Sequence, residues 1–307
     1  MENVPYLGHT LSRWTVGAST FLALPEQGAR LLNWNVTRPD GTVRDILHWP
    51  ENAGDGPLWK TRGGNPILFP FAGRCFDHGE RDFWTAPGGA RLPMPMHGLA
   101  RQGAFRLTRS DSHGFTARFL PGDEARAAYP FDYEFTVSYR FSSLSLACEL
   151  RLANRGAAPL PWCAGHHFYF TLPWNDGLSR ADYKIRVPAS KTLRQDFGNG
   201  RLTPGPKLKA VEPLSNKLLS DTLHIGLKKN TAVLGTPENG DQITVSHGLD
   251  KAPPPEAVFV TWSESGTAPY YCVEPWMGPP NAPENQTGLH WVPPGQAESF
   301  LVSIAVQ

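Results

Sequence analysis

Strict alternation of apolar and polar residues in two consecutive segments constrains the fold of this chain most. In residues 131–141 every second residue is aromatic or β-branched, and the residues between them are polar or charged. A period of two is typical of a β-strand with one buried face. The alternation resumes in residues 144–152 after a Ser-rich turn. The two segments are therefore predicted to pair as an antiparallel hairpin.

Five more segments are predicted to be strands. Residues 30–36 and 43–49 flank Arg38-Pro39-Asp40-Gly41, in which Pro and Gly are placed as in a tight turn. A third hairpin is predicted for residues 105–108 and 115–119, with a turn at residues 112–114. A last alternating run covers residues 300–306. Strands are thus expected from one end of the chain to the other.

The glycine and proline content favours the same fold class. The chain has 307 residues, of which 30 are Gly and 30 are Pro, a content more typical of many short strands than of helices. Helical periodicity is confined to residues 123–128, and no repeat or linker marks a boundary. We predict an all-β protein, one large antiparallel β-sandwich domain over residues 1–307. The Pro/Gly-rich stretches 63–98 and 275–295 are expected to form long loops over the sheet, where sites are often built.

Charge and cysteine content limit the partners and the compartment. The formal net charge is only +1, which argues against nucleic acid as the main partner. No signal peptide is apparent, and no segment approaches the ~18 apolar residues of a membrane span. Because no two cysteines form a CxxC pair, neither a disulfide framework nor a zinc ribbon is indicated. We expect a cytoplasmic protein. Its cysteines are Cys75, Cys148, Cys163 and Cys272.

Several common catalytic motifs are absent, and four dense segments remain. The chain has no serine-hydrolase elbow, nucleotide-binding glycine loop or zinc-protease motif. Polar and aromatic residues gather instead in residues 63–74, 97–101, 165–170 and 272–282. The adjacent His166 and His167 could suggest a metal site, but neighbours on a strand point to opposite faces. No metal is therefore expected.

Aromatic residues near Arg, His and Glu favour a sugar-binding site. Their rings would supply apolar faces, and the polar groups would orient the ligand. The aromatic candidates are Trp84, Trp162, Phe168, Tyr169 and Trp276.

Taken together, the four segments resemble the aldose 1-epimerase (mutarotase) family. The resemblance is to its branch with a GGxPxLFPxxGR segment followed by HGxAR, seen here at residues 63–74 and 97–101. N-x-G, P-x-P, G-x-H-x-Y-F and E-P-W-x-G follow in order at residues 154–156, 159–161, 165–170 and 274–278. The resemblance extends from about residue 5 to the C-terminus.

The resemblance implies a galactose-mutarotase-like super-sandwich that interconverts the α and β anomers of an aldose without metal or organic cofactor. By motif position, His167 matches the general acid and Glu274 the general base. Arg74, His97 and Asp221 match substrate-binding positions. The chain departs from the family pattern in having His before His167 and Phe after it. The distance of His167 from residues 169–170 favours it over its neighbour as the acid.

This reaction requires one base and one acid. The base takes the proton of the C1 hydroxyl while the acid protonates the ring oxygen; rotation about C1–C2 and the reverse transfers give the other anomer. With reference pKa values of ~4.3 for Glu and ~6.5 for His, both groups are in the required state only between these values. An ionised Glu274 is expected to raise the pKa of His167 and widen this range.

Three alternatives remain at this point. A hexose-6-phosphate epimerase would bind its dianion with several basic side chains. The chain could also be a non-catalytic sugar-binding protein of the same fold, or a purely structural module. The net charge of +1 favours a free monosaccharide as the substrate, bound by a monomer or homodimer. The basic candidates for phosphate are Arg62, Arg74, Arg81 and Arg101.

Overall fold

The computed structural model describes residues 1–53, 56–175, 177–236, 240–250 and 252–307. Within these residues, two large antiparallel sheets carry most of the chain. The first has thirteen strands, with β16 (Gly165–His166) paired to β26 and to β6 (Ile67–Leu68). The others follow in the order β1 (Glu2–Tyr6), β2 (His9–Val16), β3 (Ser19–Leu24), β4 (Arg30–Thr37), β5 (Val43–Leu47), β17 (Phe168–Thr171), β26 (Tyr270–Trp276), β25 (Val258–Trp262), β22 (Thr222–Leu227), β19 (Ala189–Gln195) and β20 (Leu202–Pro204).

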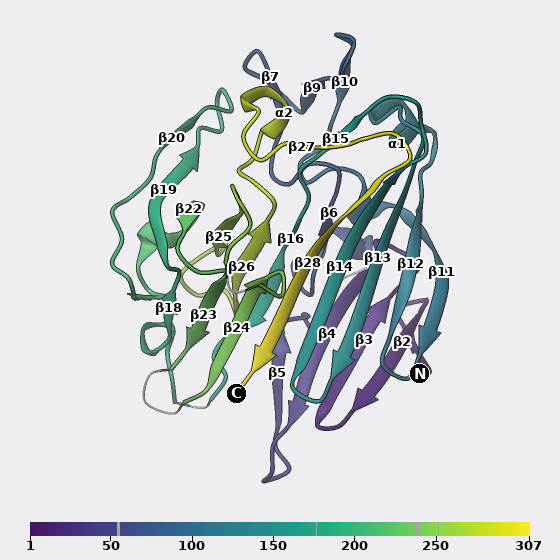
Figure 1. The fold of residues 1–307 in the computed structure, drawn as a ribbon. Helices are drawn as coiled ribbons and strands as arrows, with labels where there is room; N and C mark the ends of the chain where they lie inside the picture. The colour runs from purple at the N-terminus through teal and green to yellow at the C-terminus, as the bar shows by residue number, and fades with distance from the viewer. Residues whose placement is uncertain (54–55, 176, 237–239, 251) are drawn as a thin grey trace.

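The second sheet has nine strands and lies against one face of the first. In Figure 1 its strands β11 to β14 and β28 lie in front of β2 to β5. The strand order is β11 (Ala104–Asp111), β12 (Gly114–Leu120), β13 (Tyr133–Ser142), β14 (Ser145–Asn154), β28 (Ala297–Val306), β24 (Gln242–His247), β23 (Thr231–Gly235), β18 (Lys184–Arg186) and β21 (Glu212–Pro213). The predicted all-β antiparallel sandwich is confirmed.

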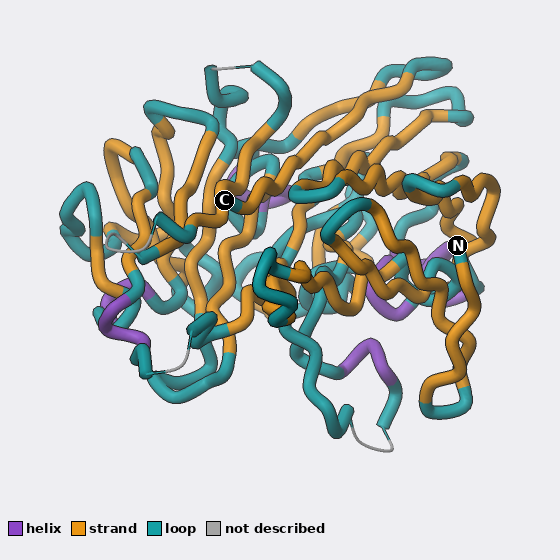
Figure 2. Tube along the Cα trace, turned by 90° about the horizontal axis from the view of Figure 1, so that it is seen from below, coloured by secondary structure: helices purple, strands orange, loops and turns teal. Residues whose placement is uncertain are grey.

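The remaining elements are short, and Figure 2 shows how little of the chain is helical. The small strands are β7 (Phe76–Asp77), β8 (Glu80–Arg81), β9 (Phe83–Thr85), β10 (Arg91–Pro93), β15 (Leu160–Trp162) and β27 (His290–Val292). The helical turns are α1 (Asp123–Ala128), α2 (Ala282–Asn285), η1 (Leu58–Lys60), η2 (Ala100–Gln102), η3 (Arg180–Asp182) and η4 (Lys217–Leu219). Among the described residues, no helix is long and apolar enough to cross a membrane.

All three predicted hairpins form. β13 pairs with β14 over their full length, and β4 pairs with β5. In the turn between β4 and β5, the Gly41 N–H donates to the Arg38 carbonyl at 2.9 Å. Gly41 has a φ of 84°, a conformation that glycine adopts without strain. β11 pairs with β12, and the helix at residues 123–128 is confirmed. The predicted loops at 63–98 and 275–295 also contain short strands and α2, which the alternation did not reveal.

Aromatic side chains fill the space between the two sheets. Phe21 of β3 stacks on Phe141 of β13 with ring centroids 4.2 Å apart. Phe69, which follows β6, stacks on Phe135 of β13 at 3.8 Å. The glycine-rich segment 63–74 is therefore anchored in the core by an aromatic ring.

Two buried histidines of the core should make stability depend on pH. Burial lowers the pKa of both His224 and His247 to about 4. Below ~6.5 the unfolded chain binds protons at these histidines that the folded chain does not bind. The free energy of unfolding should therefore fall as the pH falls from ~6.5 to ~4, by up to about 1.4 kcal/mol per pH unit for each histidine.

Urea unfolding of the parent and of His224→Gln between pH 4.5 and 8 measures this slope. The variant should lose the contribution of one histidine below pH 6.5, and the two slopes should agree above pH 7. Equal slopes over the whole range would contradict the prediction.

Candidate active site

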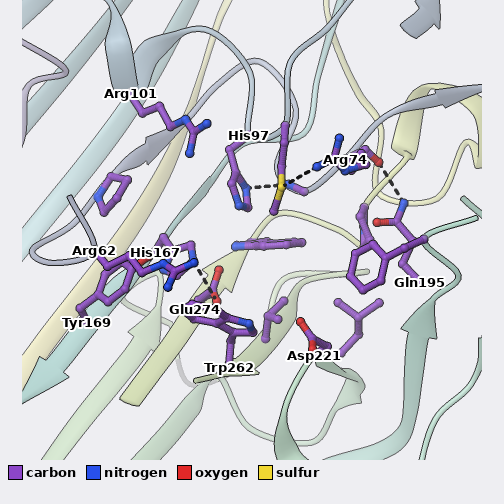
Figure 3. A pocket seen from close by; sticks show the side chains of 18 of the residues that line it. Arg62, Arg74, His97, Arg101, His167, Tyr169, Gln195, Asp221, Trp262 and Glu274 are labelled. Carbon is purple, nitrogen blue, oxygen red and sulfur yellow. Dashed lines mark hydrogen bonds and ion pairs between the residues drawn. The ribbon is translucent and has the colours of Figure 1, made fainter. Parts of the chain in front are cut away.

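A cavity opens on the face of the first sheet that is turned away from the second sheet. In β26, Tyr271 and Val273 belong to the core between the sheets, whereas Glu274 and Trp276 line the cavity. Its volume is about 370 Å³, within the usual range for small-molecule sites. Its aromatic walls are Trp59, Tyr169, Phe197, Trp262 and Trp276. Its ionisable side chains, most of them labelled in Figure 3, are Lys60, Arg62, Arg74, His97, Arg101, His167, Asp221 and Glu274.

His167 and Glu274 lie opposite each other at the floor of this cavity. Gly165 pairs with Trp276 and Phe168 pairs with Val273, so the register places His167 beside Glu274. The His167 Nε2 atom is 3.4 Å from the Glu274 Oε1 atom. Both residues are buried. The Glu274 Oε2 atom is also buried and has no hydrogen-bond partner among the described residues. One carboxylate oxygen is thus available to a ligand.

His97 adds a hydrogen-bond donor above this pair. The Gly73 backbone N–H donates to His97 Nδ1 at 3.1 Å, which leaves the ring proton on Nε2. Burial, and next the neighbouring His167, lowers the pKa of His97 well below its usual value. The His97 ring meets the His167 ring edge-on, with centroids 5.5 Å apart. A neutral His97 can therefore donate from Nε2 to a ligand oxygen.

Arg74 and Asp221 also line the cavity. The Arg74 guanidinium donates to Asp82 Oδ1 at 2.5 Å, and the Gln195 side chain donates to the Arg74 carbonyl at 2.9 Å. Asp221 precedes β22 in a left-handed conformation, with φ 53°. Burial raises the pKa of Asp221. Together with His97, His167 and Glu274, these residues complete the five predicted from the sequence, and all five line one cavity.

The protonation of the His167–Glu274 pair differs from the expectation. Burial, and next the Arg30 guanidinium, lowers the pKa of His167 to about 3. Burial, and next the Asp221 carboxylate, raises the pKa of Glu274 well above its usual value. Ionised Glu274 was expected to raise the histidine pKa, but the loss of hydration outweighs that attraction. Burial therefore favours a neutral pair that holds one proton, on Glu274.

Comparison with known proteins identifies the family of this chain. The family model of aldose 1-epimerase matches residues 13–288. The chain belongs to the aldose 1-epimerase family. A curated relative is the LacX protein of Lactococcus lactis subsp. lactis, which is 24% identical over 241 residues, or 73% of this chain and 76% of LacX.

Solved structures of other proteins have the same fold. The Slr1438 protein of Synechocystis sp. PCC 6803 superposes with a TM-score of 0.80 at 23% identity, covering 100% of this chain and 99% of the other. A galactose mutarotase related enzyme from Lactobacillus acidophilus has a TM-score of 0.77 at 21% identity, with 97% of each chain covered. The galactose-mutarotase-like architecture predicted from the motifs is thereby confirmed.

In this epimerase-family chain, the two adjacent histidines point to opposite faces of the first sheet. His166 is fully buried between the sheets, where its ring stacks on Phe168 at 5.3 Å and on Phe300 at 5.8 Å. His167 stacks instead on Tyr169, at 4.6 Å, and lines the cavity. Of the two, only His167 can reach a ligand there.

Of the aromatic residues predicted to bind a sugar, some line the cavity and others lie in the core. Tyr169 and Trp276 line the cavity as predicted. For Trp84, Trp162 and Phe168 the sugar-binding prediction is wrong, because their side chains are buried in the main hydrophobic core and do not line the cavity. Trp59 and Trp262 line the cavity but stand outside the motif segments, so no sequence signal identified them.

Asn65, within the Gly-Gly-Asn-Pro segment, was not singled out from the sequence. It is fully buried, and its Oδ1 atom accepts the His167 backbone N–H at 3.1 Å. Its Nδ2 atom donates to the Tyr139 hydroxyl at 2.7 Å and lies 3.0 Å from His166 Nδ1. Asn65 thus fixes the backbone at His167 and links it to the second sheet.

Replacing Asn65 by Leu should lower kcat more than it raises KM, because the backbone at His167 loses its partner. The unpaired buried groups should also reduce the free energy of unfolding by about 3 kcal/mol. Asn154→Leu is the matched control, since Asn154 is equally buried and makes three hydrogen bonds away from the cavity. The control should lose stability but keep kcat. An unchanged kcat in Asn65→Leu, measured by anomer exchange on the folded protein, would disprove the positioning role.

Proposed function

We propose that this chain is an aldose 1-epimerase acting on a free aldose, with Glu274 as general base and His167 as general acid. The observation that carries the proposal is the approach of His167 Nε2 to within 3.4 Å of Glu274 Oε1 at the floor of a cavity. His97, Arg74 and Asp221 surround the pair with one neutral donor, one cation and one carboxylate. These groups can donate hydrogen bonds to the hydroxyls of a sugar and accept hydrogen bonds from them.

The reaction uses the single proton of the pair. A sugar hydroxyl that donates to Glu274 stabilises the carboxylate, so that the proton moves to His167. Glu274 then takes the proton of the C1 hydroxyl while His167 protonates the ring oxygen, and the pyranose ring opens. This transfer leaves Glu274 protonated and His167 neutral, the state that burial favours. After rotation about C1–C2, the reverse transfers close the ring to the other anomer.

Anomer exchange followed by polarimetry or NMR, with a panel of free and 6-phosphorylated aldoses, tests the proposal. Acceleration over the uncatalysed exchange is expected for at least one free aldose. Sugar binding without any acceleration would favour the non-catalytic alternative instead.

A sugar 6-phosphate is the second candidate substrate, and Arg101 is the observation that favours it. Arg101 lines the cavity over the Trp59 ring, at 5.3 Å from its centroid. No ion pair of Arg101 or of the exposed Lys60 occurs within the described residues. The other basic candidates contribute less: Arg62 pairs with Glu264, Arg74 pairs with Asp82, and Arg81 is exposed on β8 outside the cavity lining.

We expect kcat/KM for free glucose or galactose to exceed that for glucose 6-phosphate by about tenfold, which corresponds to about 1.4 kcal/mol of transition-state stabilisation. The reason is that a dianion is normally bound by several basic groups, and two of the cavity's cations are already neutralised by acidic partners. Steady-state rates with both sugars at equal ionic strength measure the ratio. A higher kcat/KM for the phosphate, lost in Arg101→Met, would establish the second candidate.

A further inference from the structure

Cys272 lies beside the His167–Glu274 pair and takes no part in the proposed reaction. It stands two residues before Glu274 on β26, so both side chains point to the same face of the sheet. Its partner across the strands is Tyr169, the residue on which His167 stacks. One donor atom each from His167, Cys272 and Glu274 lies within 4.8 Å of the others. A nitrogen, a sulfur and an oxygen therefore converge from two neighbouring strands.

This donor set fits a borderline-soft divalent cation such as Zn²⁺, which binds imidazole, thiolate and carboxylate at bond lengths of ~2.0–2.3 Å. In a tetrahedral site with such bonds, the donor atoms lie about 3.3–3.8 Å apart. The 3.4 Å between His167 Nε2 and Glu274 Oε1 already falls in this range. Because the three donor atoms lie within 4.8 Å of one another, the longest separation must shorten by no more than about 1 Å to reach this range, a movement within reach of a rotation of the Cys272 side chain about χ1.

Two buried polar atoms of the site lack partners, and the cavity gives access to the site. Glu274 Oε2 and His167 Nδ1 are buried without hydrogen-bond partners among the described residues, so no hydrogen bond at these two atoms opposes a small shift of either side chain. His167 and Glu274 line the cavity, from which an ion and a water as fourth ligand can enter.

We propose that His167, Cys272 and Glu274 form an inhibitory zinc site at the floor of the cavity. Zn²⁺ binds the Cys272 thiolate and the Glu274 carboxylate, and both the thiol proton and the carboxyl proton pass to the buffer. The ion also occupies the lone pairs of His167 and Glu274, so neither group can transfer a proton. The inhibitory role rests on the proposed epimerase function, whereas the binding of zinc to these three residues does not.

Direct binding tests the site without reference to activity. The full chain, freed of metal with a chelator, is titrated with Co²⁺ and then with Zn²⁺ as competitor. One Co²⁺ should bind with a thiolate-to-cobalt absorption band, and Zn²⁺ should displace it. In Cys272→Ala the band should disappear and zinc affinity should fall by at least about 100-fold, since the loss of an outer-shell partner alone already costs about 10–100-fold. Cys148→Ala, which removes a buried thiol of the second sheet, should behave like the parent.

The absence of a thiolate band in the parent, or its survival in Cys272→Ala, would overturn the proposal. If Cys272→Ala does not fold, His167→Asn provides the second test. It keeps the thiol, so the band should remain while zinc affinity falls by at least about tenfold. Unchanged affinity in that variant would also overturn the site.

Turnover then tests whether the bound ion inhibits. The chelated protein should turn over at its full rate, Zn²⁺ should abolish turnover over the concentration range in which it binds, and added chelator should restore it. Full turnover with zinc bound would overturn the inhibitory role. If no aldose is turned over but the cobalt band is present and depends on Cys272, the proposed function fails and the metal site stands.

Discussion

Replacing Glu274 by Gln should lower kcat for anomer exchange by roughly 10²–10⁴-fold, the usual contribution of a positioned acid–base group. Gln keeps the shape of the side chain but cannot accept the C1 proton. His167→Asn should have an effect of the same order, because the amide can hydrogen-bond but cannot carry a proton to the ring oxygen. KM should change much less than kcat, since both variants leave His97, Arg74 and Asp221 in the cavity.

His166→Asn is the matched control for His167→Asn. It makes the same chemical change one residue away, on the opposite face of the sheet. Because His166 is fully buried beside Asn65, its loss should reduce the free energy of unfolding while the folded protein retains most of its kcat. Loss of turnover in folded His166→Asn, with His167→Asn nearly as active as the parent, would reverse the assignment.

The strands and hairpins that could be predicted from the sequence are those whose residue pattern lies within one short stretch of the chain. β13 and β14 alternate and are joined by a short turn, so their pairing needs no knowledge of the rest of the chain. β28 also alternates, but its place between β14 and β24 depends on contacts between segments far apart in sequence. β26 shows no alternation because all its residues are buried, on one face by the core and on the other by the cavity floor. Glu274 was therefore recognised by its motif alone, and the strand that carries it was not predicted.

The same difference applies to the candidate site, where motifs identified some residues but the roles of others depend on the fold. The five predicted residues stand in motifs or at a position matched to one, and the fold brings them to one cavity. Asn65 stands within such a motif too, but its role follows from the register of β16 against β6, which periodicity does not give. The low pKa of His167 was also missed, because it results from burial and from Arg30, a residue of β4 without any motif. Motifs identify groups, whereas burial decides how those groups are protonated.

Gly98→Ala should cause a large loss of stability, with a reduction of about 4 kcal/mol or more in the free energy of unfolding. Gly98 follows His97 in the segment 97–101 and has a φ of 75°. A Cβ atom there would lie 2.1 Å from the Phe69 carbonyl oxygen. That carbonyl accepts the Leu99 N–H at 2.6 Å, and the Phe69 ring is stacked in the core. Neither backbone can move without breaking these contacts.

Gly79→Ala separates the cost of a positive φ from the cost of the close contact with Phe69. Gly79 also has a positive φ, 84°, but nothing lies within 4 Å of the Cβ that alanine would add. The control should lose only the ~1–2 kcal/mol of a left-handed residue with a side chain. Urea unfolding at pH 7 measures both variants. The additional loss of stability in Gly98→Ala, beyond that in Gly79→Ala, is the cost of moving residues 69 and 98 apart. The same movement should displace His97, the residue before Gly98, and so lower the rate of turnover. Equal losses in the two variants would mean that the close approach at Phe69 does not limit this position.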